Sequence, residues 1–331
     1  MKALASEQGL SAIVLDGAQA LTDRGGLTGG RVMDKALKKQ WIGTVIQNHE
    51  WKYEDYRKRI GQLAKFYNEH GYKLMVIKGY GLSLNYPIPQ HRPCGDIDIW
   101  AFGKYKEADK ALLEELSIPI DSSHHHHTTF TFKDYLVENH YDFVNVHYGH
   151  GNDKLEKVFK ELAMDDSHRT EIDGQTVYLP SANLHALFVL RHTMSHFAST
   201  GMNLRQVLDW GFLIKKYSSE IDWPWFLQVV EEYHMMDFFH CLNAICVSDL
   251  GFDFASFLRF QFDMGLKDRV LEDVFAPEFD ESTPRNFFKR IPFKYRRWQA
   301  NAWKQELCYG DNRFKSFWTG VWSHLLKPSS I

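Results

Sequence analysis

The chain has 331 residues, of which 44% are hydrophobic and 24% are charged. These values are ordinary for globular proteins and exclude an intrinsically disordered or fibrous chain. Lysine and arginine number 39 against 42 aspartates and glutamates, and the net charge of −3 gives no general attraction to a nucleic-acid backbone or an anionic membrane.

The cysteines and the hydropathy pattern indicate the cellular compartment in which the protein is expected. The four cysteines are scattered without a CxxC pair, which argues against a disulfide framework and against a thiolate zinc site. The first residues lack the apolar run of a secretory signal, and nowhere do about 18 apolar residues follow one another. We therefore expect a cytoplasmic protein with no membrane span.

The predicted elements alternate in type along the first half of the chain. Helical periodicity covers residues 36–70 and 104–116, and it returns from residue 153 onward. Short apolar stretches bounded by turn residues predict strands at 72–77, 97–102, 127–132 and 135–139, with a brief further strand at 177–180. The first four strands make a mixed sheet. Beyond Pro180 the pattern is helical.

This order of elements predicts an α+β fold in three parts. A helical segment covers residues 1–70, an α/β core covers residues 71–150, and a mainly helical domain covers residues 151–331.

The sequence Gly95-Asp96-Ile97-Asp98 carries the strongest chemical signal. Residues two apart in a strand project from the same face, so Asp96 and Asp98 point their carboxylates to one side. Two such charges repel unless a cation lies between them, and Mg²⁺ takes oxygen ligands of this kind. The alternative is a solvated turn at the start of a strand.

Three further residues favour a phosphate and metal site. Gly79 ends a buried strand and lets the backbone approach a phosphate, while Lys78 beside it supplies a cation. Glu138 lies near the end of a predicted strand of the same sheet. A third carboxylate makes a site for two metal ions possible.

These residues resemble the nucleotidyltransferase superfamily that includes DNA polymerase beta and the kanamycin nucleotidyltransferases. The resemblance is to its bacterial branch of uncharacterised nucleotidyltransferases, which reads Lys-Gly, Tyr-Pro, Arg and then Gly-Asp-Ile-Asp. The matching positions here are Lys78-Gly79, Tyr86-Pro87, Arg92 and Gly95-Asp96-Ile97-Asp98. Downstream, His192, His196, Arg205 and Asp209 resemble the helical signature of the branch. The superfamily's serine is absent, since Tyr80 follows Gly79.

The resemblance implies a nucleotidyltransferase-like sheet that transfers a nucleoside monophosphate from an NTP to an acceptor hydroxyl and releases pyrophosphate. Asp96, Asp98 and Glu138 would be catalytic and would hold Mg²⁺ or Mn²⁺, with Asp142 as the rival for the third acid. Lys78, Gly79 and Arg92 would contact the substrate. A small molecule or a protein is a better acceptor than a long nucleic acid, given the net charge. A catalytically degenerate nucleotide-binding, regulatory or toxin–antitoxin protein is the alternative.

The histidines have two interpretations. His192 and His196 lie four apart on one helix face, but Thr193 stands where a zinc protease has glutamate, so they are either substrate-binding residues or a hydrogen-bonded structural pair. Arg205 joins them as a predicted substrate contact, and the alternative is a helical ion pair with Asp209, four residues further on. His140 shares a face with Glu138 and is predicted to bind substrate or to support the carboxylates of the site. The run 124–127 could bind a stray metal ion, but no acids are expected around it, and it is interpreted as a loop.

Overall fold

The chain divides into two compact units. The computed structural model describes residues 2–23, 34–145, 151–199, 201–257, 263–279, 284 and 287–310. The first unit comprises Met1–Tyr141 with Ala163–Ser181, and the second comprises Asp142–Leu162 with Ala182–Ile331. These bounds differ from the three predicted parts, because the N-terminal helices belong with the sheet and residues 142–162 belong with the helical unit.

A six-stranded mixed sheet forms the centre of the first unit, with the order β3-β4-β2-β1-β6-β5. The strands are β1 (Met75–Val76), β2 (Ile97–Trp100), β3 (His127–Phe132), β4 (Tyr135–His140), β5 (Arg169–Ile172) and β6 (Gln175–Tyr178). β2 runs parallel to β4, and β1 runs parallel to β6, whereas the other neighbours are antiparallel. The sheet confirms the predicted α+β class. Four of its strands were expected in one sheet, β6 corresponds to the further strand expected at 177–180, and β5 was not predicted.

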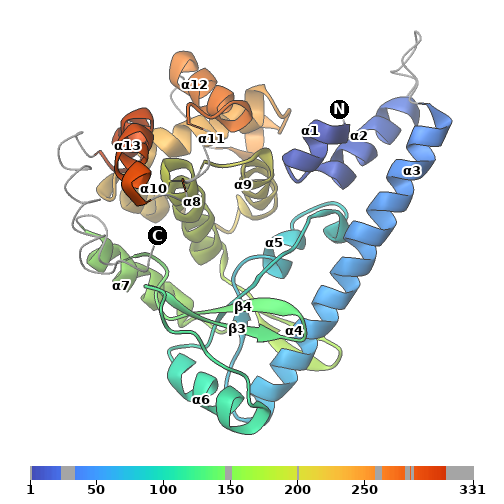
Figure 1. The fold of residues 1–331 in the computed structure, drawn as a ribbon, viewed down its shortest axis with the longest axis vertical. Coiled ribbons are helices and arrows are strands. Elements are labelled where there is room, and N and C mark those ends of the chain that lie inside the picture. The colour runs from blue at the N-terminus through green and yellow to red at the C-terminus, as the bar shows by residue number, and fades with distance from the viewer. Residues whose placement is uncertain are drawn as a thin grey trace. The chain divides into compact units, whose positions relative to one another are not determined.

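Helices of the first unit flank this sheet. They are α1 (Lys2–Glu7), α2 (Ser11–Asp23), α3 (Lys35–Val45), a π-helical turn η1 (Ile46–Glu50), α4 (Trp51–Glu69), α5 (Tyr80–Ser83), the 3₁₀ turn η2 (Pro89–His91) and α6 (Tyr105–Leu116). Figure 1 shows α3 and α4 joined end to end as a single long blue rod. The Asp34 carboxylate begins α3 by accepting from the backbone N–H of Leu37, as an N-cap does.

One face of the sheet packs on α4 and α6. Ile97 and Ile99 of β2 and Val137 of β4 are fully buried there, in a core that includes Leu63 of α4 and Leu112 of α6. Burying each such side chain is worth about 1.5–3 kcal/mol. Because side chains alternate along a strand, the residues between them face the other way, and these include Asp98 and Glu138.

A two-residue turn fixes the register of β3 and β4. Lys133 and Asp134 both have positive φ, +49° and +73°, which is the conformation of the tight hairpin turn whose twist matches that of the strands. Phe132 therefore faces Tyr135, and at the far end of the hairpin His127 faces His140.

The second unit is helical in the part of it that the structure describes, as predicted for the chain beyond Pro180. Its elements are α7 (Asn152–Ala163), α8 (Ala182–Ser199), α9 (Leu204–Tyr217), α10 (Trp223–Glu232), α11 (Met236–Ser248), the 3₁₀ turn η3 (Phe254–Ser256), α12 (Met264–Phe275) and α13 (Phe287–Tyr309). Among the helices of the described ranges, none combines the length and apolar character needed to cross a membrane.

The turn from β1 into α5 depends on Gly79. Its φ is +53°, and a Cβ added there would lie 2.1 Å from the hydroxyl oxygen of Tyr56. That hydroxyl donates to the backbone carbonyl of Asp96 at 2.9 Å, so Tyr56 joins the turn to the start of β2. Packing against Tyr56 is therefore a sufficient structural reason for glycine at this position.

Replacing Gly79 by alanine should destabilise the protein by about 3 kcal/mol, because strain at positive φ adds to the overlap with Tyr56. Gly71→Ala is the matched control, since Gly71 has φ +71° but nothing within 4 Å of the added Cβ, and we expect a loss of about 1 kcal/mol. Urea unfolding measures both. Equal losses at the two glycines would show that the Tyr56 contact is unimportant.

Candidate functional site

The polar face of the sheet collects a cluster of acids and a histidine. In the parallel register of β2 and β4, Asp98 is the direct partner of Glu138, and His140 lies two residues further on. Carboxylate oxygens of Asp98 and Glu138 and a ring nitrogen of His140 all lie within 4.8 Å of one another. Asp98 and His140 are only 3% and 4% exposed. We call these three residues the acid cluster.

Lys78 provides the compensating charge. Its Nζ lies 2.7 Å from Oδ1 of Asp98. The contact follows from the sheet, because β1 pairs with β2 and the backbone N–H of Ile77 donates to the Asp98 carbonyl at 3.0 Å. Lys78 comes directly after this hydrogen bond, so its side chain starts beside Asp98.

These contacts set the protonation of the acid cluster. Burial opposes the charged form of Asp98, but the Lys78 ammonium and the His140 imidazole outweigh it and hold the pKa of Asp98 well below its usual range. Burial likewise acts against ionised Glu138, and the hydrogen bond from His140 still lowers the pKa of Glu138. For His140, burial favours the neutral ring, yet hydrogen bonds to Asp98 and Glu138 raise the pKa of His140.

A second group of histidines adjoins the acid cluster, and here the expectation of a loop without acids around it was wrong for His127. His127 begins β3, and its Nε2 lies 3.9 Å from Oε1 of Glu138. Ring nitrogens of His126, His127 and His140 lie within 4.8 Å of one another. Burial and the neighbouring rings lower the pKa of His126 to about 3, and burial lowers that of His127 to about 4. The hairpin register that brings His127 opposite His140 is the signal that sequence reasoning missed.

Asp96 and Arg92 lie around this face in different ways. Asp96 is exposed and precedes β2, and it is in neither of the two clusters that the described residues form. Arg92 is 6% exposed, and its Nη1 donates to the carbonyls of Gly79 and Pro93 at 3.3 and 3.0 Å. Arg92 therefore fastens the turn that carries Lys78.

The remaining predicted residues belong to the second unit. His192 and His196 lie together on α8, with ring centroids 4.4 Å apart, and Arg205 lies in the first turn of α9. Asp142, the rival for the third acid, forms an ion pair with Lys160 of α7. Glu138, in contrast, lies opposite Asp98 in the register of β4 and β2.

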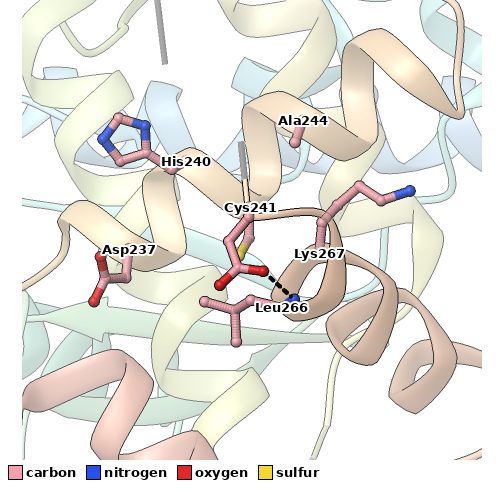
Figure 2. Close-up of a pocket in the computed structure, with 7 residues that line it drawn as sticks. Asp237, His240, Cys241, Ala244, Leu266 and Lys267 are labelled. Carbon is pink, nitrogen blue, oxygen red and sulfur yellow. Dashed lines mark hydrogen bonds between the residues drawn. The ribbon is translucent and has the colours of Figure 1, made fainter. Parts of the chain in front are cut away.

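A cavity in the second unit offers a different kind of site. Asp237, His240 and Cys241 of α11 and Lys267 of α12 help to line a volume of about 300 Å³ (Figure 2). Burial raises the pKa of the Cys241 thiol to about 12, and a thiol that stays protonated is a poor nucleophile. The nearby ammonium of Lys267 is paired with Asp249 and Asp268. The acid cluster is therefore the stronger candidate.

Comparison with known proteins agrees with the resemblance seen in the sequence. The family model described as "Uncharacterised nucleotidyltransferase" matches residues 2–250, and the chain belongs to this family. One similar solved structure is that of an antigenic nucleotidyltransferase-like protein from Paracoccidioides brasiliensis, with 16% identity and a TM-score of 0.34, over 53% of this chain and 87% of that chain. Among curated proteins no match is found.

Breaking the Lys78–Asp98 pair should destabilise the fold. We expect Lys78→Met to cost about 2–4 kcal/mol, because it leaves the buried Asp98 carboxylate with one cationic partner fewer. In an Asp98→Asn background the same substitution should cost less than about 1 kcal/mol, since the carboxylate that Lys78 contacts directly is no longer charged. A double-mutant cycle by urea unfolding measures the coupling, and additive effects would refute it.

Proposed function

We propose that the protein transfers a nucleoside monophosphate from an NTP to an acceptor hydroxyl at the acid cluster and releases pyrophosphate. One observation carries this proposal: in-register strands bring Asp98 and Glu138 together on one sheet face, with Lys78 beside them. Family membership supports an enzyme of this class.

The donor set fits a hard divalent cation. Two carboxylates from adjacent strands supply the oxygen ligands that Mg²⁺ or Mn²⁺ prefers. Asp98 and Glu138 would hold the ion, and Asp96, which is exposed and precedes β2, is retained as a predicted third acid of the site. When bound, the ion neutralises phosphate charge as it develops in the reaction.

The residues of the chain have distinct roles in this proposal. Glu138 accepts the proton of the acceptor hydroxyl while the hydroxyl oxygen of the acceptor bonds to the α-phosphorus. The bond between the α-phosphorus and the oxygen that bridges it to the β-phosphorus breaks, and pyrophosphate is released. His140 orients both carboxylates, and Lys78 offers its ammonium to the phosphates. Arg92 and Gly79 hold the turn that carries Lys78.

Substrate contacts outside the sheet stay predictions. We retain His192, His196 and Arg205 as predicted substrate-binding residues on the resemblance alone. The acceptor is a small molecule or a protein in preference to a long nucleic acid, because the net charge of −3 does not favour a polyanion. The proposed compartment is the cytoplasm.

One observation favours the alternative, a catalytically degenerate nucleotide-binding or regulatory protein of the same fold. Lys78 and His140 already contact Asp98 at 2.7 and 3.2 Å, so the charge of this carboxylate is compensated without a metal ion. The superfamily's serine is also absent, since Tyr80 follows Gly79. Metal-dependent turnover separates the two functions.

Asp98→Asn and Glu138→Gln should each lower turnover by about 100-fold or more, because each removes one of two oxygen ligands that the proposal gives to the ion. The assay is pyrophosphate release from the four NTPs with Mg²⁺ or Mn²⁺ and pooled acceptors. Asp134→Asn is the matched control, since Asp134 is an exposed acid in the hairpin turn. Near-normal turnover in either cluster variant would refute the assignment.

Nucleotide binding should require the divalent ion and should discriminate weakly among bases. At an effective dielectric constant near 20, a charge pair about 4 Å apart contributes about 4 kcal/mol, so acids facing a triphosphate oppose binding strongly unless a cation intervenes. Calorimetric titration of ATP and GTP with Mg²⁺, and then with excess chelator, measures this. Equal affinity with and without metal would favour the alternative, a catalytically degenerate nucleotide-binding protein, over the enzyme.

A further inference from the structure

Two histidines, His126 and His127, adjoin the acid cluster beside its own His140, and the proposed transfer reaction uses only His140. Ring nitrogens of His126, His127 and His140 lie within 4.8 Å of one another. The ring centroids of His126 and His127 are 4.4 Å apart, and those of His127 and His140 are 5.3 Å apart. We call these three residues the histidine cluster.

The histidine cluster carries polar atoms that the protein itself does not satisfy. The Nδ1 atoms of His126, His127 and His140 are all buried and make no hydrogen bond, although His127 and His140 are only 6% and 4% exposed. A buried polar atom left without a partner costs about 1–3 kcal/mol. Three such atoms within one small cluster suggest that a ligand satisfies them.

Backbone hydrogen bonds hold the cluster in place. The hairpin register puts His127 opposite His140 on paired strands. The backbone N–H of Tyr141 donates to the carbonyl of His126 at 3.0 Å, and the Tyr141 hydroxyl donates to the carbonyl of His124 at 2.9 Å. The residues before β3 are therefore tied to the end of β4, so the rings come together without needing a ligand to order the chain.

We propose that His126, His127 and His140 form a transition-metal site of the zinc type. The site lies beside the acid cluster and prefers different metal ions. Imidazole nitrogens suit Zn²⁺, Co²⁺ or Ni²⁺, whereas Mg²⁺ prefers oxygen. Three protein ligands leave one position of a tetrahedral ion for water or another ligand.

The surroundings of His140 match those of a metal-binding histidine. Its Nε2 lies 3.2 Å from Oδ1 of Asp98, and a carboxylate at one ring nitrogen commonly orients the ring so that the other nitrogen can bind metal. Tetrahedral zinc with bonds of 2.0–2.1 Å separates its ligand atoms by about 3.4 Å. The ring nitrogens lie within 4.8 Å of one another, so an ion bound there would draw them closer together. Occupation of this site does not depend on the nucleotide chemistry proposed above.

Titration of the full chain with Co²⁺ in excess Mg²⁺, followed by visible absorption, tests the site. We expect about one Co²⁺ per chain with a ligand-field band, displaced by Zn²⁺. His126→Gln/His127→Gln should weaken the affinity at least about tenfold, because two of three ligands are lost. His124→Gln/His125→Gln is the matched control, since it removes two histidines of the same run that are outside the cluster, and it should change the affinity less than about twofold.

In the Co²⁺ titration, either of two outcomes would overturn the proposal: unchanged Co²⁺ affinity in His126→Gln/His127→Gln, or an equal loss in the control. Histidine-ring NMR of the wild-type chain keeps the test independent of whether the variants fold. Substoichiometric Zn²⁺ should shift the ring nitrogens of His126, His127 and His140 first. Shifts that begin at other histidines would refute the site.

Discussion

The parallel, in-register pairing of β2 with β4 is the constraint on which the site depends. It makes Asp98 the neighbour of Glu138 and brings His140 to the same face, so that two carboxylates share a largely buried position. Burying charges costs several kcal/mol each unless partners compensate them. Lys78 and His140 provide that compensation, the first through the β1–β2 pairing and the second from β4 itself. A change of register by one residue would turn the acids into the apolar core.

One face of the sheet stabilises the fold, and the other face carries the polar residues of the candidate site. Ile97, Ile99 and Val137 bury one face against α4 and α6, which stabilises the strands and fixes their register. The stability that this apolar core provides offsets the repulsion between the polar groups on the other face. His140 belongs to both clusters on that face: one offers mainly oxygen atoms and the other only ring nitrogens. Hard and borderline cations differ in which of these donors they prefer.

Local patterns in the sequence predicted much of this arrangement. Alternation placed Asp98 on a polar face, the hairpin at 127–139 was expected, and Glu138 was expected on a strand of the same sheet. The strand β5 was missed, because its polar sequence lacks the apolar run by which the other strands were found. The helices α1 and α2 lie within the helical segment expected over residues 1–70, although their individual bounds were not predicted. The run 124–127 was treated as a loop apart from His127 at the start of the expected hairpin, and the pairing of His127 with His140 was not predicted. The two-residue turn at Lys133-Asp134 sets the register that produces this pairing.

Lys78 is the residue that separates a catalytic from a binding function. Its ammonium contacts the same carboxylate that the proposal assigns to a divalent ion, so the two cations compete for Asp98. A divalent ion carries twice the charge, and it arrives with a triphosphate whose oxygens can accept the displaced ammonium. Lys78 is partly exposed, with 18% of its side chain accessible, so it can turn toward such a ligand without crossing the core. A lysine that moves in this way would exchange Asp98 for phosphate as the nucleotide binds, which makes the resting ion pair compatible with catalysis.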